Sequence, residues 1–133
     1  METDKKSIIE EWGATLIHRS NRYIKMPLTV EGKIDRCFSA TTHKAFGRVS
    51  IRPADKLEFG FNGYADQELY FAKWFVFGVL DILLIEGLGK IAVDVIDIEI
   101  DPISSSAEAF RSAGRDAGKK VMAEVKEKHL WSV

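Results

Sequence analysis

One continuous stretch, residues 91–118, constrains the fold more than any other part of the chain, because it encodes a strand, a turn and a helix in succession. From Ile91 to Val95, apolar residues alternate with smaller or polar ones, which is the period-two pattern of a half-buried strand. The alternation then slips by one residue at Ile96. The sequence therefore predicts a strand over 91–100 that contains a β-bulge near Val95–Ile96.

The same stretch marks where this strand ends and the next helix begins. Pro102 cannot donate a hydrogen bond to a neighbouring strand, so we expect the strand to end there, with Asp101 serving the turn. Within the serine run 104–106, Ser105 is followed three residues later by Glu108, which is a capping-box signature for a helix over 104–127. The helix carries a stripe of small side chains, namely Ala109, Ala113, Gly114, Ala117 and Gly118. We expect this stripe to let the helix approach a sheet closely.

Patterns upstream complete the predicted order as three strands, a helix, a strand and a helix. Two strands, over 28–38 and 45–52, are joined by a loop at 39–44. A third strand at 57–61 and a long helix at 66–85 follow them. Strands that precede a helix–strand–helix unit indicate an α+β two-layer sandwich.

Length and composition predict a single globular domain over residues 1–133. The chain is 46% hydrophobic and 29% charged, which excludes a disordered protein. The one cysteine, Cys37, cannot form an internal disulfide, so a reducing, cytoplasmic location is expected. The opening residues carry mixed charges rather than a signal segment, and the apolar run 69–85 contains Lys73 and Asp81, so no membrane span is expected.

Several short segments together resemble one translation factor family. They are, in order, EGK at 31–33, FGRVSI at 46–51, GVLDILL at 78–84, VDV at 93–95, AF at 109–110 and AG at 113–114. Their order and spacing resemble those of domain IV of translation elongation factor G over roughly residues 25–125. The chain is thus expected to be a stand-alone relative of that domain, because it contains no phosphate-binding GxxxxGK[ST] loop of a GTPase.

This resemblance implies a particular version of the sandwich. A four-stranded sheet carries two helices on one face, as in the second domain of ribosomal protein S5, and its βαβ crossover is left-handed. Residues 1–22 then form an extra N-terminal segment. Within it, residues 4–17 fit either a short amphipathic helix or an edge strand.

Charge is segregated along the chain, although the formal net charge is only −1. Residues 19–56 carry nine basic and three acidic side chains, whereas residues 57–110 carry two basic and ten acidic ones. In the family, the loop of the first hairpin reaches the tRNA–mRNA region of the ribosome. The sequence therefore predicts weak, sequence-independent binding of RNA phosphates, or of the ribosome, by Lys33, Arg36, His43, Lys44 and Arg48.

Both loops at that end of the domain depart from the family's pattern. The first, residues 39–44, contains no glycine, whereas the family's loop is glycine-rich and can approach phosphates closely. The second is reduced to residues 101–103. The translocation role therefore cannot be transferred residue by residue, and a solvated basic hairpin without a ligand stays the alternative.

The helix predicted at 66–85 is apolar nearly all round, which is typical of a helix buried on more than one side. One stripe suffices to cover a sheet, and it leaves Val76, Phe77, Leu80 and Leu84 on or near the other side. Either the segment 1–22 or a second copy of the chain must cover these four residues. We expect a homo-oligomer with this set as its interface, and an adaptor or structural homo-oligomer is the competing function.

Two other charged sets are expected to be solvated. Asp97 and Glu99 are the polar phase of an alternating strand rather than a magnesium site. The last helix carries Arg111, Arg115 and Lys119 at successive i, i+4 positions, which indicates an outer basic face.

No constellation of residues supports catalysis. The three histidines lie far apart in the sequence, no pair of residues has metal-ligand spacing, and no nucleophile motif is present. The sequence predicts a non-enzymatic protein that has no cofactor, no metal and no bound nucleotide.

Overall fold

The computed structural model describes residues 22–38 and 41–132 of the protein. Its elements are β1 (Arg22–Ile24), β2 (Leu28–Phe38), β3 (Thr41–Pro53), β4 (Glu58–Gly60), α3 (Asp66–Leu83), β5 (Leu88–Glu99), α4 (Ala107–Lys128) and β6 (Trp131–Ser132). The segment predicted at 4–17 lies outside the described residues.

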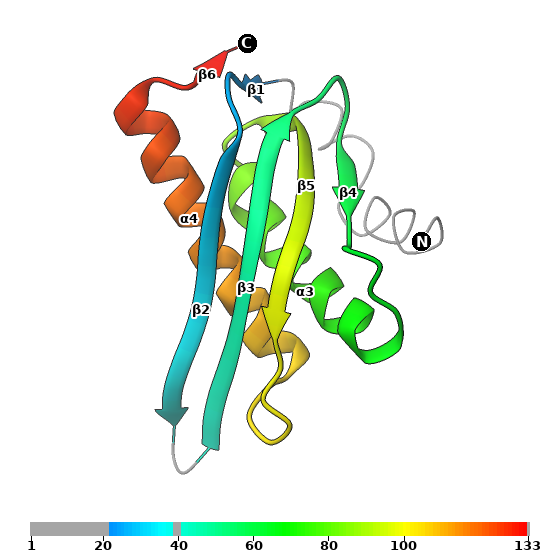
Figure 1. Cartoon of the computed structure of the whole chain (residues 1–133). Helices are drawn as coiled ribbons and strands as arrows, with labels where there is room; N and C mark the ends of the chain where they lie inside the picture. The colour runs from blue at the N-terminus through cyan, green and yellow to red at the C-terminus, as the bar shows by residue number, and fades with distance from the viewer. Residues whose placement is uncertain (1–21, 39–40, 133) are drawn as a thin grey trace.

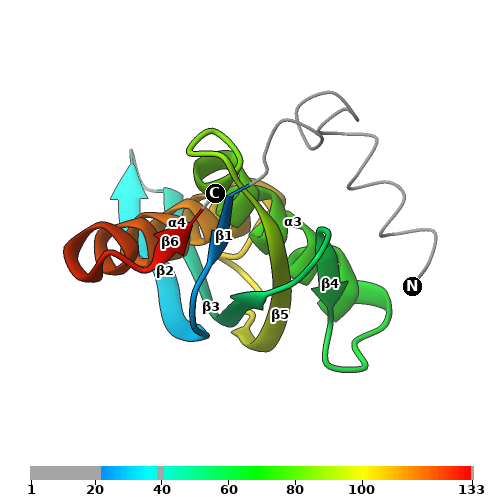
Figure 2. The same ribbon diagram turned by 90° about the horizontal axis from the view of Figure 1, so that it is seen from above.

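The strands β2, β3, β5 and β4 form a mixed four-stranded sheet with both helices on one face (Figures 1 and 2). β3 is antiparallel to β2 and β5, and β4 is parallel to β5. The α+β two-layer sandwich is thereby confirmed. Two short strands that the sequence analysis did not predict extend the sheet, because β1 pairs with the start of β5 and β6 pairs with β1.

The crossover from β4 through α3 to β5 is left-handed. In Figure 1 both strands point downwards, α3 lies behind the sheet, and β5 lies to the left of β4. A right-handed crossover would place β5 on the other side of β4, and about 98% of such units are right-handed. This rare handedness is the one that the resemblance implied.

The hairpin of β2 and β3 is longer than predicted. The register runs without interruption from Leu28↔Ile51 to Phe38↔Thr41, so residues 41–44, predicted as loop, belong to β3. The loop prediction was wrong because the β-branched pair Thr41 and Thr42 continues the strand opposite β2.

The bulge predicted in β5 is confirmed. Arg48 pairs with Asp97, whereas the next residue, Val49, pairs with Val95. Ile96 is therefore the extra residue of the bulge. Because it has no partner on β3, the apolar residues of β5 before and after it lie on the same face of the sheet.

The two helices touch at glycines. A Cβ atom on Gly78 of α3 would overlap the carbonyl oxygen of Arg111 in α4, and one on Gly114 of α4 would overlap the carbonyl oxygen of Phe75 in α3. The stripe expected to face the sheet thus packs in part against α3. No larger residue fits at this crossing without moving a backbone.

The remaining part of the stripe faces β2. A Cβ atom on Gly32 would overlap the carbonyl oxygen of Ala113 and would lie 2.8 Å from the Cβ of Ala117. Gly47, directly opposite Gly32 in the register, lies under the ring of Phe75, which a Cβ atom would meet at 2.6 Å. This cross-strand glycine pair therefore lets both helices come close to the sheet.

An ion-pair cluster joins the helices beside the crossing. Asp81 of α3 accepts two hydrogen bonds from Arg111, at 2.7 and 2.8 Å, and one from Arg115 at 2.8 Å. The guanidinium of Arg111 also lies 5.7 Å from the ring centre of Trp74 and 5.6 Å from that of Phe77. The expectation that Arg111 and Arg115 belong to a purely solvated face is corrected, because both are held by α3.

The arginines change the acidity of Asp81. Burial alone would raise the pKa of its carboxyl, but the hydrogen bonds and charges of Arg111 and Arg115 outweigh burial and hold the pKa below its ordinary value. The carboxylate side chain is only 12% exposed, so the pairs are weakly screened by solvent.

We predict that Gly114→Ala destabilises the protein by about 1–3 kcal/mol, since overpacking outweighs the gain of about 1 kcal/mol that alanine normally brings to a helix. The free energy of unfolding in urea measures the effect. Gly118→Ala on the same helix is the matched variant: its Cβ would mainly meet the side chain of Ile82, so the loss should be smaller. A stabilised Gly114→Ala protein would contradict the close crossing.

We predict that Asp81→Asn lowers the free energy of unfolding at pH 7 by about 2–3 kcal/mol. The folded pKa of Asp81 is depressed, so its contribution is present above the unfolded pKa, about 3.9, and is lost as the pH falls through the lower folded pKa. Urea titrations of wild type and variant should therefore converge in acid.

Asp94→Asn is the control for this experiment. Asp94 pairs with Arg52 at 2.9 Å, but both side chains are at least one-third exposed, so its loss should cost less than about 1 kcal/mol. Equal losses in the two variants, or a difference that persists at low pH, would contradict the role given to Asp81.

Candidate nucleic-acid interface

The closed end of the β2–β3 hairpin projects beyond the rest of the sheet (Figure 1). Side chains along a strand alternate between faces, so the five predicted RNA contacts divide into two groups. Lys33, Lys44 and Arg48 lie on the open face, which is the face of the sheet opposite the helices. Arg36 and His43, which pair across the hairpin, lie on the helix-facing side.

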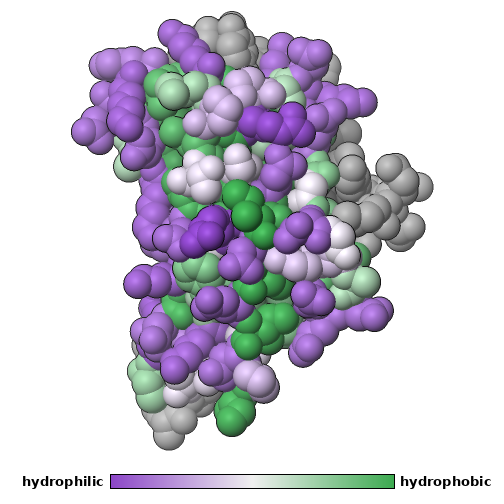
Figure 3. Space-filling model, viewed as in Figure 1, coloured by the Kyte–Doolittle hydropathy of each residue, from purple (hydrophilic) through white to green (hydrophobic). Residues whose placement is uncertain are grey.

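The open face neutralises much of its own charge. Arg48 donates to Glu31 at 3.1 Å and Arg52 to Asp94 at 2.9 Å, while Lys44 lies opposite Asp35 in the register. Figure 3 shows this face as mostly hydrophilic, with hydrophobic side chains confined to a narrow strip. Such a face has little positive excess to attract phosphate.

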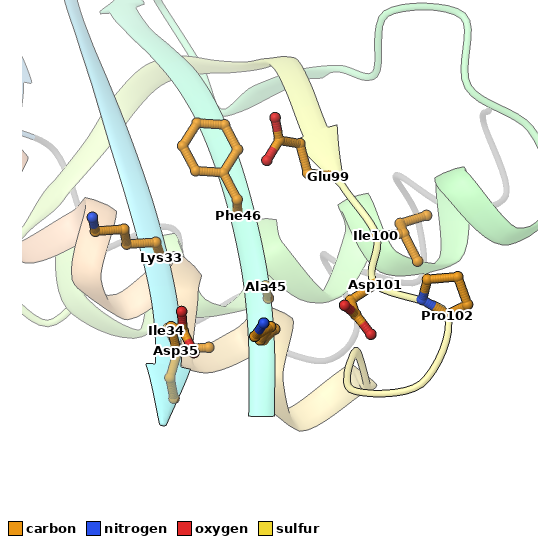
Figure 4. Close-up of a pocket in the computed structure, with 10 residues that line it drawn as sticks. Lys33, Ile34, Asp35, Ala45, Phe46, Glu99, Ile100, Asp101 and Pro102 are labelled. Carbon is orange, nitrogen blue, oxygen red and sulfur yellow. The ribbon is translucent and has the colours of Figure 1, made fainter. Parts of the chain in front are cut away.

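A shallow cavity of about 380 Å³ lies on the open face near the hairpin end (Figure 4). The ring of Phe46 lies between Lys33 on β2 and Glu99 on β5. The charged residues of its lining are Lys33, Lys44, Asp35, Glu99 and Asp101. Three carboxylates against two lysines make this cavity a poor site for an anion.

The loop after β5 is ordered by its own hydrogen bonds. The carboxylate of Asp101 accepts from the backbone N–H groups of Ser104, at 2.8 Å, and Ile103, at 3.0 Å. These two bonds, with Ser104 the larger influence, lower the pKa of Asp101. The role of Asp101 in the turn is thereby confirmed.

Ser106, not Ser105, caps α4. The hydroxyl of Ser106 accepts from the N–H of Ala109 at 3.0 Å. Ser105 instead donates to the carbonyl of Lys44 at 2.7 Å and accepts from the N–H of Asp101 at 2.8 Å. The capping-box prediction was wrong by one residue because Ser105 is used to fasten the loop to β3.

α4 runs along the outer edge of β2 and bonds two of the backbone groups on that edge. The N–H of Lys33 donates to the carboxylate of Asp116 at 3.1 Å, and the ammonium of Lys120 donates to the carbonyl of Glu31 at 2.8 Å. Asp116 and Lys120 are also paired with each other at 3.1 Å. The edge is thereby protected from pairing with another strand.

Between this edge and α4 lies a cavity of about 270 Å³, which we call the β2–α4 groove. The charged and hydroxyl-bearing residues of its lining are Lys33 and Arg36 from β2, and Ser112, Arg115, Asp116 and Lys119 from α4. The side chain of Lys33 lies on the open face and only its backbone N–H reaches Asp116, so three basic side chains, Arg36, Arg115 and Lys119, face one acid among these described residues. The groove is therefore the most positively charged of the cavities described around the hairpin.

The part of this groove that α4 contributes was not predicted from the sequence. The i, i+4 spacing of Arg115 and Lys119 was visible, but it did not show that this face of the helix lies beside β2. Lys33 and Arg36 precede these residues by about 80 positions, so only the fold brings them together.

The four apolar residues predicted to form an oligomer interface are buried within the protein. The exposed fractions are 0% for Val76 and Leu80, 1% for Leu84 and 4% for Phe77. The predicted oligomer interface is corrected accordingly, since a second copy is not needed to keep these residues from water. Residues 1–21, which belong to the other predicted cover, lie outside the described residues, and oligomerisation stays a prediction without this support.

Metal binding and membrane insertion were considered for residues 22–38 and 41–132 from the arrangement of their side chains and the character of their helices. No group of three or more His, Cys, Asp or Glu side chains in these ranges is arranged to hold a metal ion. Neither described helix has the length and apolar character to cross a membrane.

Comparison with known proteins identifies the fold but not a family. No family model and no curated protein matches the chain. Among 52 matching chains of solved structures, the crystal structure of ttk003000868 from Thermus thermophilus is similar, with a TM-score of 0.65 and 22% identity. The match covers 78% of this chain and 17% of that chain. This similarity supports the two-layer fold alone.

Proposed function

We propose that the protein is a non-enzymatic relative of elongation factor G domain IV that associates with RNA, through the phosphate backbone of ribosomal or other structured RNA. The projecting β2–β3 hairpin carries this proposal, because it places Lys33, Arg36, His43 and Lys44 on the part of the domain that extends furthest from the core. Basic side chains on a projecting element are typical of contacts to phosphate.

The fold supports the relationship on two further points. The left-handed β4–α3–β5 crossover is uncommon, and the resemblance implied it. Two of the matched segments contain Gly32 and Gly47, which face each other in the register at a place where each packs against a helix. Glycine at these positions is thus explained by the packing of this fold.

We predict that the protein binds structured RNA and ribosomes weakly and without sequence preference. With about three or four phosphates contacted, a plot of log Kobs against log salt should have a slope of roughly −2 to −4. Fluorescence anisotropy with an RNA hairpin and ribosome co-sedimentation, each between about 50 and 200 mM salt, measure the two interactions.

The sequence preference is checked with two RNA hairpins of equal length and different base sequence, whose affinities should agree within about threefold. A large preference for one would contradict binding by phosphate contacts. Undetectable binding to both RNA and ribosomes at about 50 mM salt, where phosphate contacts are strongest, would refute the proposed function.

A further inference from the structure

We infer that RNA phosphates bind in the β2–α4 groove rather than on the open face of the sheet, so that side chains of α4 take part in the contacts. This inference rests on the proposed function. The competing location is the open face, where Lys44 and Arg48 were predicted to bind RNA.

Charge balance favours the groove. The one acid among its described lining residues, Asp116, already accepts the N–H of Lys33 and pairs with Lys120, a lysine outside the cavity lining. The basic side chains therefore dominate the potential inside the groove. Arg115 is also paired, but it shares the single carboxylate of Asp81 with Arg111, so positive charge stays in excess there. On the open face, Arg48 and Arg52 each pair with a separate carboxylate.

One donor of the groove is held in place before any ligand arrives. The Nε of Arg115 donates to Asp81 at 2.8 Å, which fixes the guanidinium while 48% of the side chain stays exposed. A positioned guanidinium loses less conformational entropy on binding a phosphate than a free lysine does. The hydroxyl of Ser112, in the same lining, can donate a further hydrogen bond.

The shape of the groove fits an extended polyanion. A second cavity, of about 340 Å³, shares Arg36 and Ser112 with the groove and adds His43 and Glu108, so the hollow continues toward the hairpin end while its positive charge stays concentrated in the groove. In the part of the chain that the structure describes, no aromatic ring of Phe, Tyr or Trp lines either cavity. Without such a ring on which a base can stack, the contacts are expected to go to the backbone of the RNA.

The test compares two double variants that each remove two positive charges. Arg36→Gln with Lys119→Gln alters the groove, and Lys44→Gln with Arg48→Gln alters the competing site on the open face as the matched control. Binding of a single-stranded oligouridylate is measured by anisotropy from about 50 to 200 mM salt. The groove variant should reduce the steepness of the salt slope by about 1.4, or about 0.7 for each lost phosphate contact, while the control keeps the wild-type slope.

A second measurement needs no variant. Amide resonances of wild-type residues 33–36 and 112–119 should shift on titration with oligouridylate, and those of 94–99 should not. Shifts in the groove with inorganic phosphate but none with oligouridylate would overturn the inference, because the groove would then be a small-anion site.

The possible failures are distinguishable. If wild-type protein binds no RNA at all, the proposed function fails. If it binds RNA but the two double variants lose equal slope, or the resonance shifts fall on 94–99, only the location in the β2–α4 groove is wrong.

Discussion

The close approach of α4 to its two neighbours is the contact on which the rest of the structure depends. Gly78 and Gly114 let the helices cross with backbones touching, and Gly32 lets β2 reach the same helix. Because α4 is fixed on both sides, its polar face can serve the edge of β2 through Asp116 and Lys120. The same placement builds the β2–α4 groove, so core packing and the candidate binding surface have one origin.

The hairpin consequently has two chemically different sides. On the open face, acids from β2 and β5 neutralise the arginines of β3, as Glu31 does for Arg48. On the helix-facing side, β2 and α4 bring basic residues together. One of them, Arg115, forms an ion pair with Asp81 of α3. An anion should therefore bind more strongly on the helix-facing side of these two strands than on the open face.

The fold could largely be predicted because its signals are local. The slip in alternation at Ile96 marked the bulge, and the order of strands and helices defined the sandwich. The groove could not be predicted, since it joins residues about 80 positions apart and depends on which way α4 faces. Leu80 and Leu84 were misjudged for a similar reason, because one-dimensional periodicity does not show how many sides of a helix the chain itself covers.

Photo-crosslinking shows whether RNA lies against α4 in the complex. RNA containing 4-thiouridine would be irradiated in complex with the wild-type protein, and the modified peptides identified by mass spectrometry. If RNA lies in the groove, crosslinks should fall within residues 33–36 and 112–119, on both of its walls. Crosslinks confined to residues 44–52 and 94–99 on the open face would contradict it.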